Sequence, residues 1–368
     1  MSSAQHSRLN KAVIVDGVRT PFLDSGGAYS ELMTYELGGK AIAGLVEKTG
    51  INPNSINLVT MGTVLHEVET GNVARESMLS AGLPATIPAY TTSMAGLSAS
   101  MGFSNLCDMI ALGRIDVGIA AGVESFSDLP IRYSQKIRRA AMKLRQDPSA
   151  GNIVKNLLTL RPADLKPAMP TGTDFTTGKT MGVCAEQMVQ KFKVSRQACD
   201  EFTERSHRLA IEALEQGHFE NTIVPVKVPG LSQSITHDNT PRADSKADKL
   251  SRMKPVFKKD GIITAAGSSR FTDGSAALLL TSQQAAEQHG LQPLATVVDY
   301  QLAGVKNLEQ EMLLGPAVSI PKLLSRNGLS MANIDVWELH EAFAAQVLVN
   351  MACMAQPEYA DEYYGGQV

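Results

Sequence analysis

Two stretches near opposite ends of the chain share one helix–turn–strand pattern. Residues 45–59 read LVEKTGINPNSINLV, and residues 323–337 read LLSRNGLSMANIDVW. The two align without a gap at a constant offset of 278 positions, from Gly50 to Gly328. A second, weaker match of the same order joins AVIVDG near the start to ATVVDY after the middle. Two matched segments in one order predict a chain built from two related halves.

Short apolar runs alternate with helical segments in both halves. Strands are predicted at 11–15, 56–65, 116–125, 274–280, 295–300 and 334–339, and helices at 35–49, after Gly96 and at 320–328. The first helix ends at a glycine, as helices commonly do. Buried strands that alternate with helices favour an α/β architecture with parallel sheets.

A segment of different composition interrupts this alternation. From Ile131 to Lys259 the chain is rich in Lys, Arg and Pro and contains helical stretches. We interpret this segment as an inserted loop domain. The predicted organisation is an N-terminal half over 1–130, the inserted domain over 131–259 and a C-terminal half over 260–368.

The charge and the cysteines narrow the class of function. A net charge of −3 provides no general attraction for nucleic acid. The four cysteines form no CxxC pair, so reduced thiols are expected and a metal site is not. The first residues have no apolar signal segment and no later run is long enough to span a bilayer, which favours a cytoplasmic protein.

The stretch TTSMAGLSAS at 91–100 is typical of an elbow that presents a nucleophile at the start of a helix. Its central residue is Gly96, which has no side chain. Ser93 and Ser98 flank it, and we interpret both as turn and cap serines, because a hydroxyl without a neighbouring base is a poor nucleophile. The predicted site therefore lacks its reactive group.

These segments together resemble the thiolase family, and within it the thiolase subunits of fatty-acid β-oxidation trifunctional complexes. The motifs that carry the resemblance are VRTPF, NVARESMLSAGLP, AYTTSMAGLSAS, GVESFSDLP, MGVCAEQM, ITAAGSSRFTDGSAA and HEAFAAQ, in the family's order along the whole chain. The resemblance implies an αβαβα layered sandwich of two related halves. It also implies an acetyl-CoA C-acyltransferase that converts a 3-ketoacyl-CoA and CoA to acyl-CoA and acetyl-CoA, with no cofactor besides CoA as substrate.

Two departures from the family bear on activity. The position of Gly96 holds the nucleophilic cysteine in the family, and the family's Gly-His-Pro and Cys-x-Gly motifs are absent before the chain ends at Val368. We therefore expect a second half truncated at its C-terminus and a chain that is inactive alone. The alternatives are a non-catalytic thiolase-like subunit or CoA-binding partner, and an interrupted gene.

The resemblance implies roles for three other residues. His340, in HEAF, matches the position that orients a water or the thioester oxygen, and is predicted at the end of the strand before it. Arg242 matches an arginine near the adenine nucleotide, and Ser269 matches a serine that contacts the pantetheine. The competing interpretations are a helix-capping histidine for His340 and a solvated loop charge for Arg242.

The segment 132–145 carries six cations and no acid on a helical frame. Three interpretations remain open: a solvated helix, a membrane-surface or partner helix, and a phosphate patch for CoA. The resemblance places this region toward the partner subunit and the membrane. It also implies a homodimer and a hydratase/dehydrogenase α subunit as partner.

Overall fold

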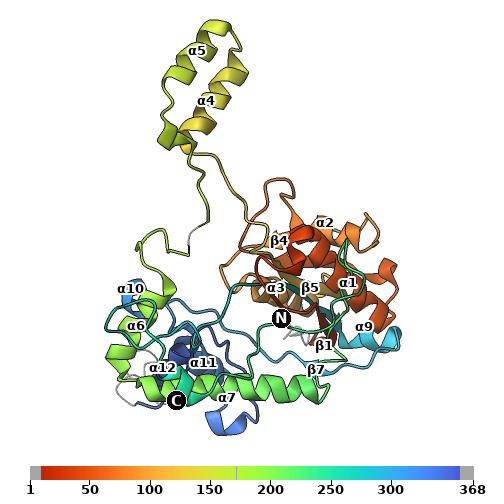
Figure 1. The fold of residues 1–368 in the computed structure, drawn as a ribbon. Helices are drawn as coiled ribbons and strands as arrows, with labels where there is room; N and C mark the ends of the chain where they lie inside the picture. The colour runs from red at the N-terminus through yellow and green to blue at the C-terminus, as the bar shows by residue number, and fades with distance from the viewer. Residues whose placement is uncertain (1–9, 171, 357–368) are drawn as a thin grey trace, which may run out of the picture.

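The computed structural model describes residues 10–170 and 172–356 (Figure 1). The elements up to the insert are β1 Ala12–Arg19, β2 Leu23–Asp24, η1 Ala28–Glu31, α1 Thr34–Thr49, η2 Pro53–Ser55, β3 Leu58–Gly62, α2 Val73–Ser80, β4 Ala89–Thr92, α3 Ser98–Ala111 and β5 Val117–Glu124. The insert contains α4 Gln135–Gln146, α5 Ala150–Leu158, η3 Pro162–Leu165, α6 Met181–Phe192, α7 Arg196–Glu215 and α8 Ala247–Leu250. The remaining elements are β6 Thr272–Ser282, α9 Gln283–Gln288, β7 Ala295–Thr296, α10 Leu308–Glu311, α11 Gly315–Arg326, η4 Met331–Asn333 and α12 Ala344–Met354.

Among the described residues, one seven-stranded sheet forms the centre of the first half. Its main path runs β4-β3-β5-β6-β1-β7, and β2 pairs with β6. β3 is parallel to β4 and β5, whereas β6 is antiparallel to its neighbours β5 and β1. β1 to β5 therefore run in one direction and β6 and β7 run against them, with β6, which follows the insert in sequence, between β5 and β1.

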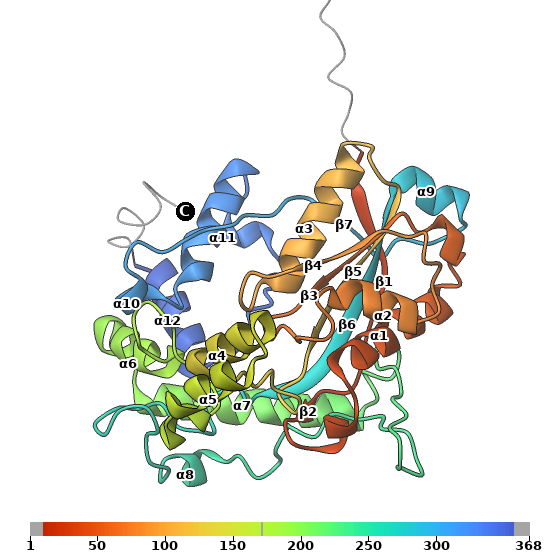
Figure 2. The same cartoon turned by 90° about the horizontal axis from the view of Figure 1, so that it is seen from above.

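Helices cover both faces of this sheet. α1 and α2 lie on one face and α3 lies on the other (Figure 2). Ile42 and Leu45 of α1 are fully buried in the first interface, and Leu106 and Ile110 of α3 in the second. Burying a side chain of this size stabilises the fold by about 1.5–3 kcal/mol, so these helices form because their apolar stripes have a sheet to cover.

The structure confirms the matched helix–turn segments of the repeat. Gly50 and Gly328 both adopt the left-handed backbone conformation, each with φ of 64°, just after α1 and α11. The short helices η2 and η4 follow at equivalent positions, and Ile56 and Ile334 are the residues that cap them. The two segments therefore share their turn geometry as well as their sequence.

The strand predicted over 334–339 is wrong. The described chain forms no strand there, and Val336 and Trp337 are 81% and 40% exposed. Among the described residues, no backbone–backbone hydrogen bond involves 335–341. A strand needs a neighbour that satisfies its N–H and C=O groups, and no other described segment provides one here.

The strand predicted over 295–300 is also mostly absent. Only Ala295–Thr296 pairs, as β7, and its partner is β1 of the first half. Val298 lies beyond this pairing and is largely exposed. The segment has the apolar pattern of a strand, but the short antiparallel contact with β1 satisfies the backbone hydrogen bonds of its first residues only.

The insert has two parts of different character. α4 and α5 form a hairpin that projects away from the body of the molecule (Figure 1). α6 and α7 instead share one buried core with α11 and α12, through residues such as Met188, Cys199 and Val349. The insert is therefore partly an integral layer of the C-terminal half.

Candidate functional site

The elbow predicted from the sequence is present between β4 and α3. Its turn is held by the buried Ser98, whose hydroxyl accepts a hydrogen bond from the Met94 N–H at 2.8 Å and donates to the Ala95 carbonyl at 2.6 Å. Ala95 has a positive φ of 46°, a conformation that is costly for a residue with a side chain. Ser98 is thus a turn residue, as expected, and both of its hydrogen-bonding directions are occupied.

Gly96 lies at the outer side of this elbow. The residue is exposed, and no heavy atom lies within 4 Å of the position that a Cβ would occupy. Its backbone N–H is two residues before the first residue of α3, where the helix dipole favours negative charge. The elbow therefore has room for a side chain, and its electrostatics suit an anion.

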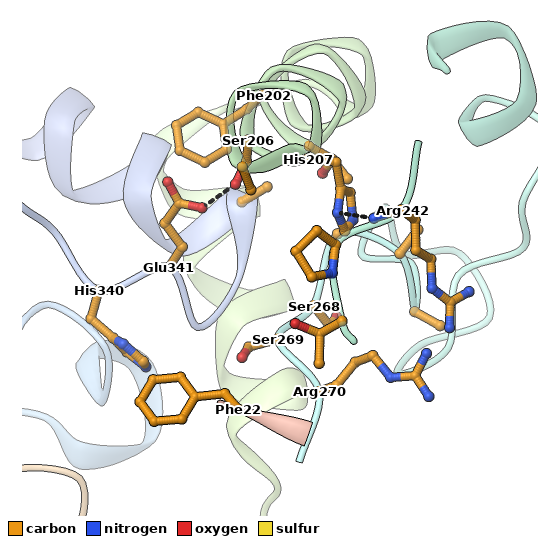
Figure 3. Close-up of a pocket in the computed structure, with 18 of the residues that line it drawn as sticks. Phe22, Phe202, Ser206, His207, Arg242, Ser268, Ser269, Arg270, His340 and Glu341 are labelled. Carbon is orange, nitrogen blue, oxygen red and sulfur yellow. Dashed lines mark hydrogen bonds between the residues drawn. The ribbon is translucent and has the colours of Figure 1, made fainter. Parts of the chain in front are cut away.

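A cavity of about 860 Å³ lies between the insert and the segment around His340 (Figure 3). Its walls come from α7, the loop 240–242, the loop 265–270 and the segment 338–341. Its residues are Phe22, Phe202, Thr203, Ser206, His207, Ala210, Thr240, Pro241, Arg242, Met253, Ala265, Ala266, Gly267, Ser268, Ser269, Arg270, Glu338, Leu339, His340, Glu341 and Ala344.

The structure brings three of the four predicted site residues together. Arg242, Ser269 and His340 line this cavity, each from a different loop, whereas Gly96 is not among the lining residues. His340 is at the end of an extended segment rather than of a paired strand, so its predicted position at a sheet edge is wrong. Loops, not a strand end, therefore position these three side chains.

Backbone hydrogen bonds hold the His340 segment against the neighbouring loop. The Ser269 N–H donates to the Ala342 carbonyl at 2.9 Å, and the Ala344 N–H donates to the Gly267 carbonyl at 3.0 Å. On the other side, the Ser206 hydroxyl donates to the Glu341 carboxylate at 2.5 Å. His340, whose ring is exposed, is therefore next to a residue held by its side chain and two residues before the backbone that is bonded to the loop.

Several lining residues were missed by the sequence reasoning. His207 of α7 accepts a hydrogen bond at Nδ1 from the Arg242 N–H at 3.2 Å, and burial together with the Arg242 charge lowers the pKa of His207. Arg270 pairs with Asp24 at 2.6 Å, and in Figure 3 its guanidinium lies on the same side of the pocket as that of Arg242. Arg270 is one residue from Ser269 and His207 is on a helix of the insert, and the sequence offered no other signal for either residue.

All four cysteines are buried away from solvent. Burial raises the pKa of Cys107 and of Cys199 to about 12, and it raises the pKa of Cys184. Cys353 is in α12, within the core shared with α6. None of the four lines the cavity, which agrees with the structural role expected for them.

The described residues contain neither a metal-binding cluster nor a membrane-spanning helix. Within 10–170 and 172–356, no three His, Cys, Asp or Glu side chains are grouped so that they could hold a metal ion. Over the same residues, every helix is too short or too polar to cross a membrane.

Comparison with protein families defines the class. The profile for Thiolase, N-terminal domain, matches residues 12–284, and the profile for Thiolase, C-terminal domain, matches residues 291–368. The chain therefore belongs to the thiolase family, and the resemblance inferred from its motifs is confirmed.

Individual relatives narrow the resemblance. The chain is 39% identical over 358 residues to the human trifunctional enzyme subunit beta, mitochondrial, covering 97% of this chain and 75% of that protein. It is 40% identical over 370 residues to a probable 3-ketoacyl-CoA thiolase of Caenorhabditis elegans, covering 98% and 80%.

A solved structure confirms the thiolase fold. The acetyl-CoA acetyltransferase of Bacillus anthracis matches with a TM-score of 0.83 and 31% identity, over 98% of this chain and 87% of that one.

Proposed function

We propose that this chain descends from acetyl-CoA C-acyltransferases of fatty-acid β-oxidation, binds CoA and acyl-CoA in the cavity described above, and does not complete thiolysis alone. The observation that carries the proposal is the elbow at Gly96, which has the shape of a nucleophile site and lacks a side chain. In this proposal CoA is a substrate and the protein uses no other cofactor. The proposed location of the protein is the cytoplasm.

Thiolysis of a 3-ketoacyl-CoA requires a nucleophile at a carbonyl carbon, a base that generates it and donors that hold the oxyanion. Gly96 supplies only a backbone N–H, which is suited to half of an oxyanion hole. Ser98 is no substitute, because its hydroxyl is buried and both donates and accepts within the turn. The buried cysteines lie elsewhere, so no thiolate of the described chain replaces the missing one.

The cavity has properties that suit the long, phosphorylated CoA molecule. Its volume is in the range of cofactor and ligand sites, and both apolar and polar residues line its walls. Arg242 also lines a smaller neighbouring cavity of about 300 Å³ with Arg208 and Lys246. The cations at this end would face the phosphates, and Ser269 and His340 would face the pantetheine and the thioester.

Calorimetric titration with CoA tests this proposal. Wild-type protein should bind CoA, and Arg242→Gln should weaken binding about fivefold, because an exposed charge pair contributes up to about 1 kcal/mol. The matched control is Arg114→Gln, which changes an exposed arginine outside the cavity and should leave the affinity unchanged. Thiolysis of a 3-ketoacyl-CoA should be undetectable in all three proteins. Failure of the wild type to bind CoA, or measurable turnover, contradicts the proposal.

The second candidate is a non-catalytic thiolase-like subunit or CoA-binding partner of a β-oxidation complex, and it rests on the same empty elbow. Its partners would be a second copy of the chain and a hydratase/dehydrogenase α subunit. Edge strand β4 is the candidate contact, because it pairs only with β3 among the described strands, and of its outer groups the Ala89 carbonyl accepts from the Asn72 side chain at 2.9 Å. The two candidates differ in whether a catalytic partner restores turnover.

The α4–α5 hairpin is proposed to contact a membrane surface. α4 carries the basic segment, and the hairpin exposes Met142, Val154, Leu157 and Leu158, with Leu158 82% exposed. Cations and exposed apolar side chains together suit a surface of anionic lipid. A helix that contacts only water would not be expected to expose this much apolar area.

Sedimentation with phospholipid vesicles tests the hairpin. Vesicles that contain phosphatidylserine should retain the wild type, and Leu157→Asp with Leu158→Asp should release most of it, since two charges replace two inserted side chains. Leu209→Asp, at another exposed apolar position on α7, is the matched control and should bind like the wild type. Equal binding of the double variant, or of phosphatidylcholine vesicles, excludes this role.

A further inference from the structure

We infer that Glu186 is a positioning residue for the candidate site: its carboxylate fixes the loop that forms one wall of the cavity and that holds the His340 segment in place. Glu186 is on α6 of the insert, outside the cavity. The inference rests on the proposed function only in that the ligand of the cavity is taken to be CoA.

The carboxylate of Glu186 holds the backbone of the neighbouring loop by hydrogen bonds, an arrangement we call the clamp. Its side chain is almost completely buried, and it accepts hydrogen bonds from the Ile262 N–H at 3.0 Å and the Ile263 N–H at 2.8 Å. Gly261 passes so close that an added Cβ would lie 2.2 Å from Oε1 of Glu186. The close approach of carboxylate and chain therefore depends on a glycine at that point.

A buried carboxylate in a core position lowers the stability of the fold unless its charge is compensated. Taking the charge out of water costs several kcal/mol unless hydrogen bonds compensate for it. No ion pair among the described residues includes Glu186, so the two backbone N–H groups are its compensation. An apolar residue would stabilise the core between α6 and α12 without this cost, but it would not determine the path of the loop.

The clamped loop reaches the site within a few residues. From Ile263 it continues to Gly267 and Ser269, which form the two backbone hydrogen bonds with Ala344 and Ala342 described above. Between them, Ser268 forms a bridge with Phe343. Hydrogen bonds thus join the carboxylate to the loop and the loop to 342–344, and His340 follows from there along the chain.

Hydrogen exchange and CoA titration on the same variants test the inference. In Glu186→Ala, exchange should rise in 262–269 and also in 340–344, with α1 and β5 unchanged, and the Kd for CoA should rise about tenfold, as expected for losing hydrogen bonds to a charged group. Glu186→Gln should recover most of both properties, because one carbonyl oxygen can still accept from both N–H groups.

The matched control is Glu124→Ala. Glu124 is a partly buried carboxylate that also accepts from two backbone N–H groups, those of Val64 and Leu65, but its loop does not line the cavity. Exchange should then rise around 63–65 and the Kd should not change. The inference is overturned if exchange in Glu186→Ala rises only at 262–264, if Glu186→Gln raises exchange at 340–344 as much as Glu186→Ala does, or if the wild type binds CoA and the alanine variant binds it equally well. If the wild type does not bind CoA, the proposed function fails, and the exchange at 340–344 alone decides the inference.

Discussion

Gly96→Cys is expected to create a thiol that alkylates with iodoacetamide at least about tenfold faster near neutral pH than any native cysteine, since thiolate content controls the rate. The new side chain has open space around it and lies at the N-terminus of α3, where the helix dipole stabilises the thiolate. The pKa of Cys107 and of Cys199 is raised to about 12 by burial, so both should react slowly. Alkylation rate against pH, followed by peptide mass mapping, measures the difference.

A second variant distinguishes the effect of the helix dipole on the alkylation rate from the effect of exposure alone. Gly71→Cys places a thiol at another exposed glycine with open space, in a loop before α2. Gly96→Cys should react faster than Gly71→Cys below the ordinary pKa of a thiol, and the two should converge at high pH. Equal rates throughout would mean that the elbow does not activate a thiol.

Gly62→Ala is expected to destabilise the protein by about 1–3 kcal/mol, the usual cost of adding a methyl group to a packed site. The structure has little room to relax here, because the atoms nearest the new methyl group belong to the backbone. Gly62 ends β3, and an added Cβ would lie 2.1 Å from the Ala99 nitrogen and 2.3 Å from the Ser98 carbonyl carbon. The first turn of α3 would have to move away from the sheet. Denaturant unfolding measures the loss of free energy.

The same displacement should disturb the elbow. Combined with Gly96→Cys, Gly62→Ala should lower the alkylation rate of the introduced thiol toward that of an ordinary exposed cysteine. Gly151→Ala, in α5 with no atom near the new Cβ, is the control and should leave stability unchanged or slightly raised. A Gly62→Ala protein as stable as the wild type would show that α3 does not rest on β3 as described.

Local patterns determined much of the fold in advance. The helix over α1, its end at Gly50 and the elbow before α3 follow from residues within a few positions of one another, and all are present. Apolar periodicity decides which face of a helix is buried, and glycine decides where the chain turns. The motifs that carry the family resemblance are local in the same way, and the family assignment is confirmed.

The candidate site was only partly predictable. Motif matching proposed Arg242, Ser269 and His340, and the structure brings these three to one cavity. His207 and the clamp at Glu186 carry no local signal, because their roles depend on which loops α6 and α7 pack against. A side chain becomes part of a pocket only when segments distant in sequence meet around it.

What the sequence determined by itself is therefore the family and fold class of the chain, many of its helices and turns, and the missing side chain at Gly96. Only the tertiary structure decided that β6 lies between β5 and β1, that α6 and α7 join the core of the C-terminal half, and that the segment 334–339 stays unpaired. The physical reason is that a helix satisfies its backbone hydrogen bonds within its own segment. A strand satisfies them only through a neighbour, whose presence and order the local sequence does not encode.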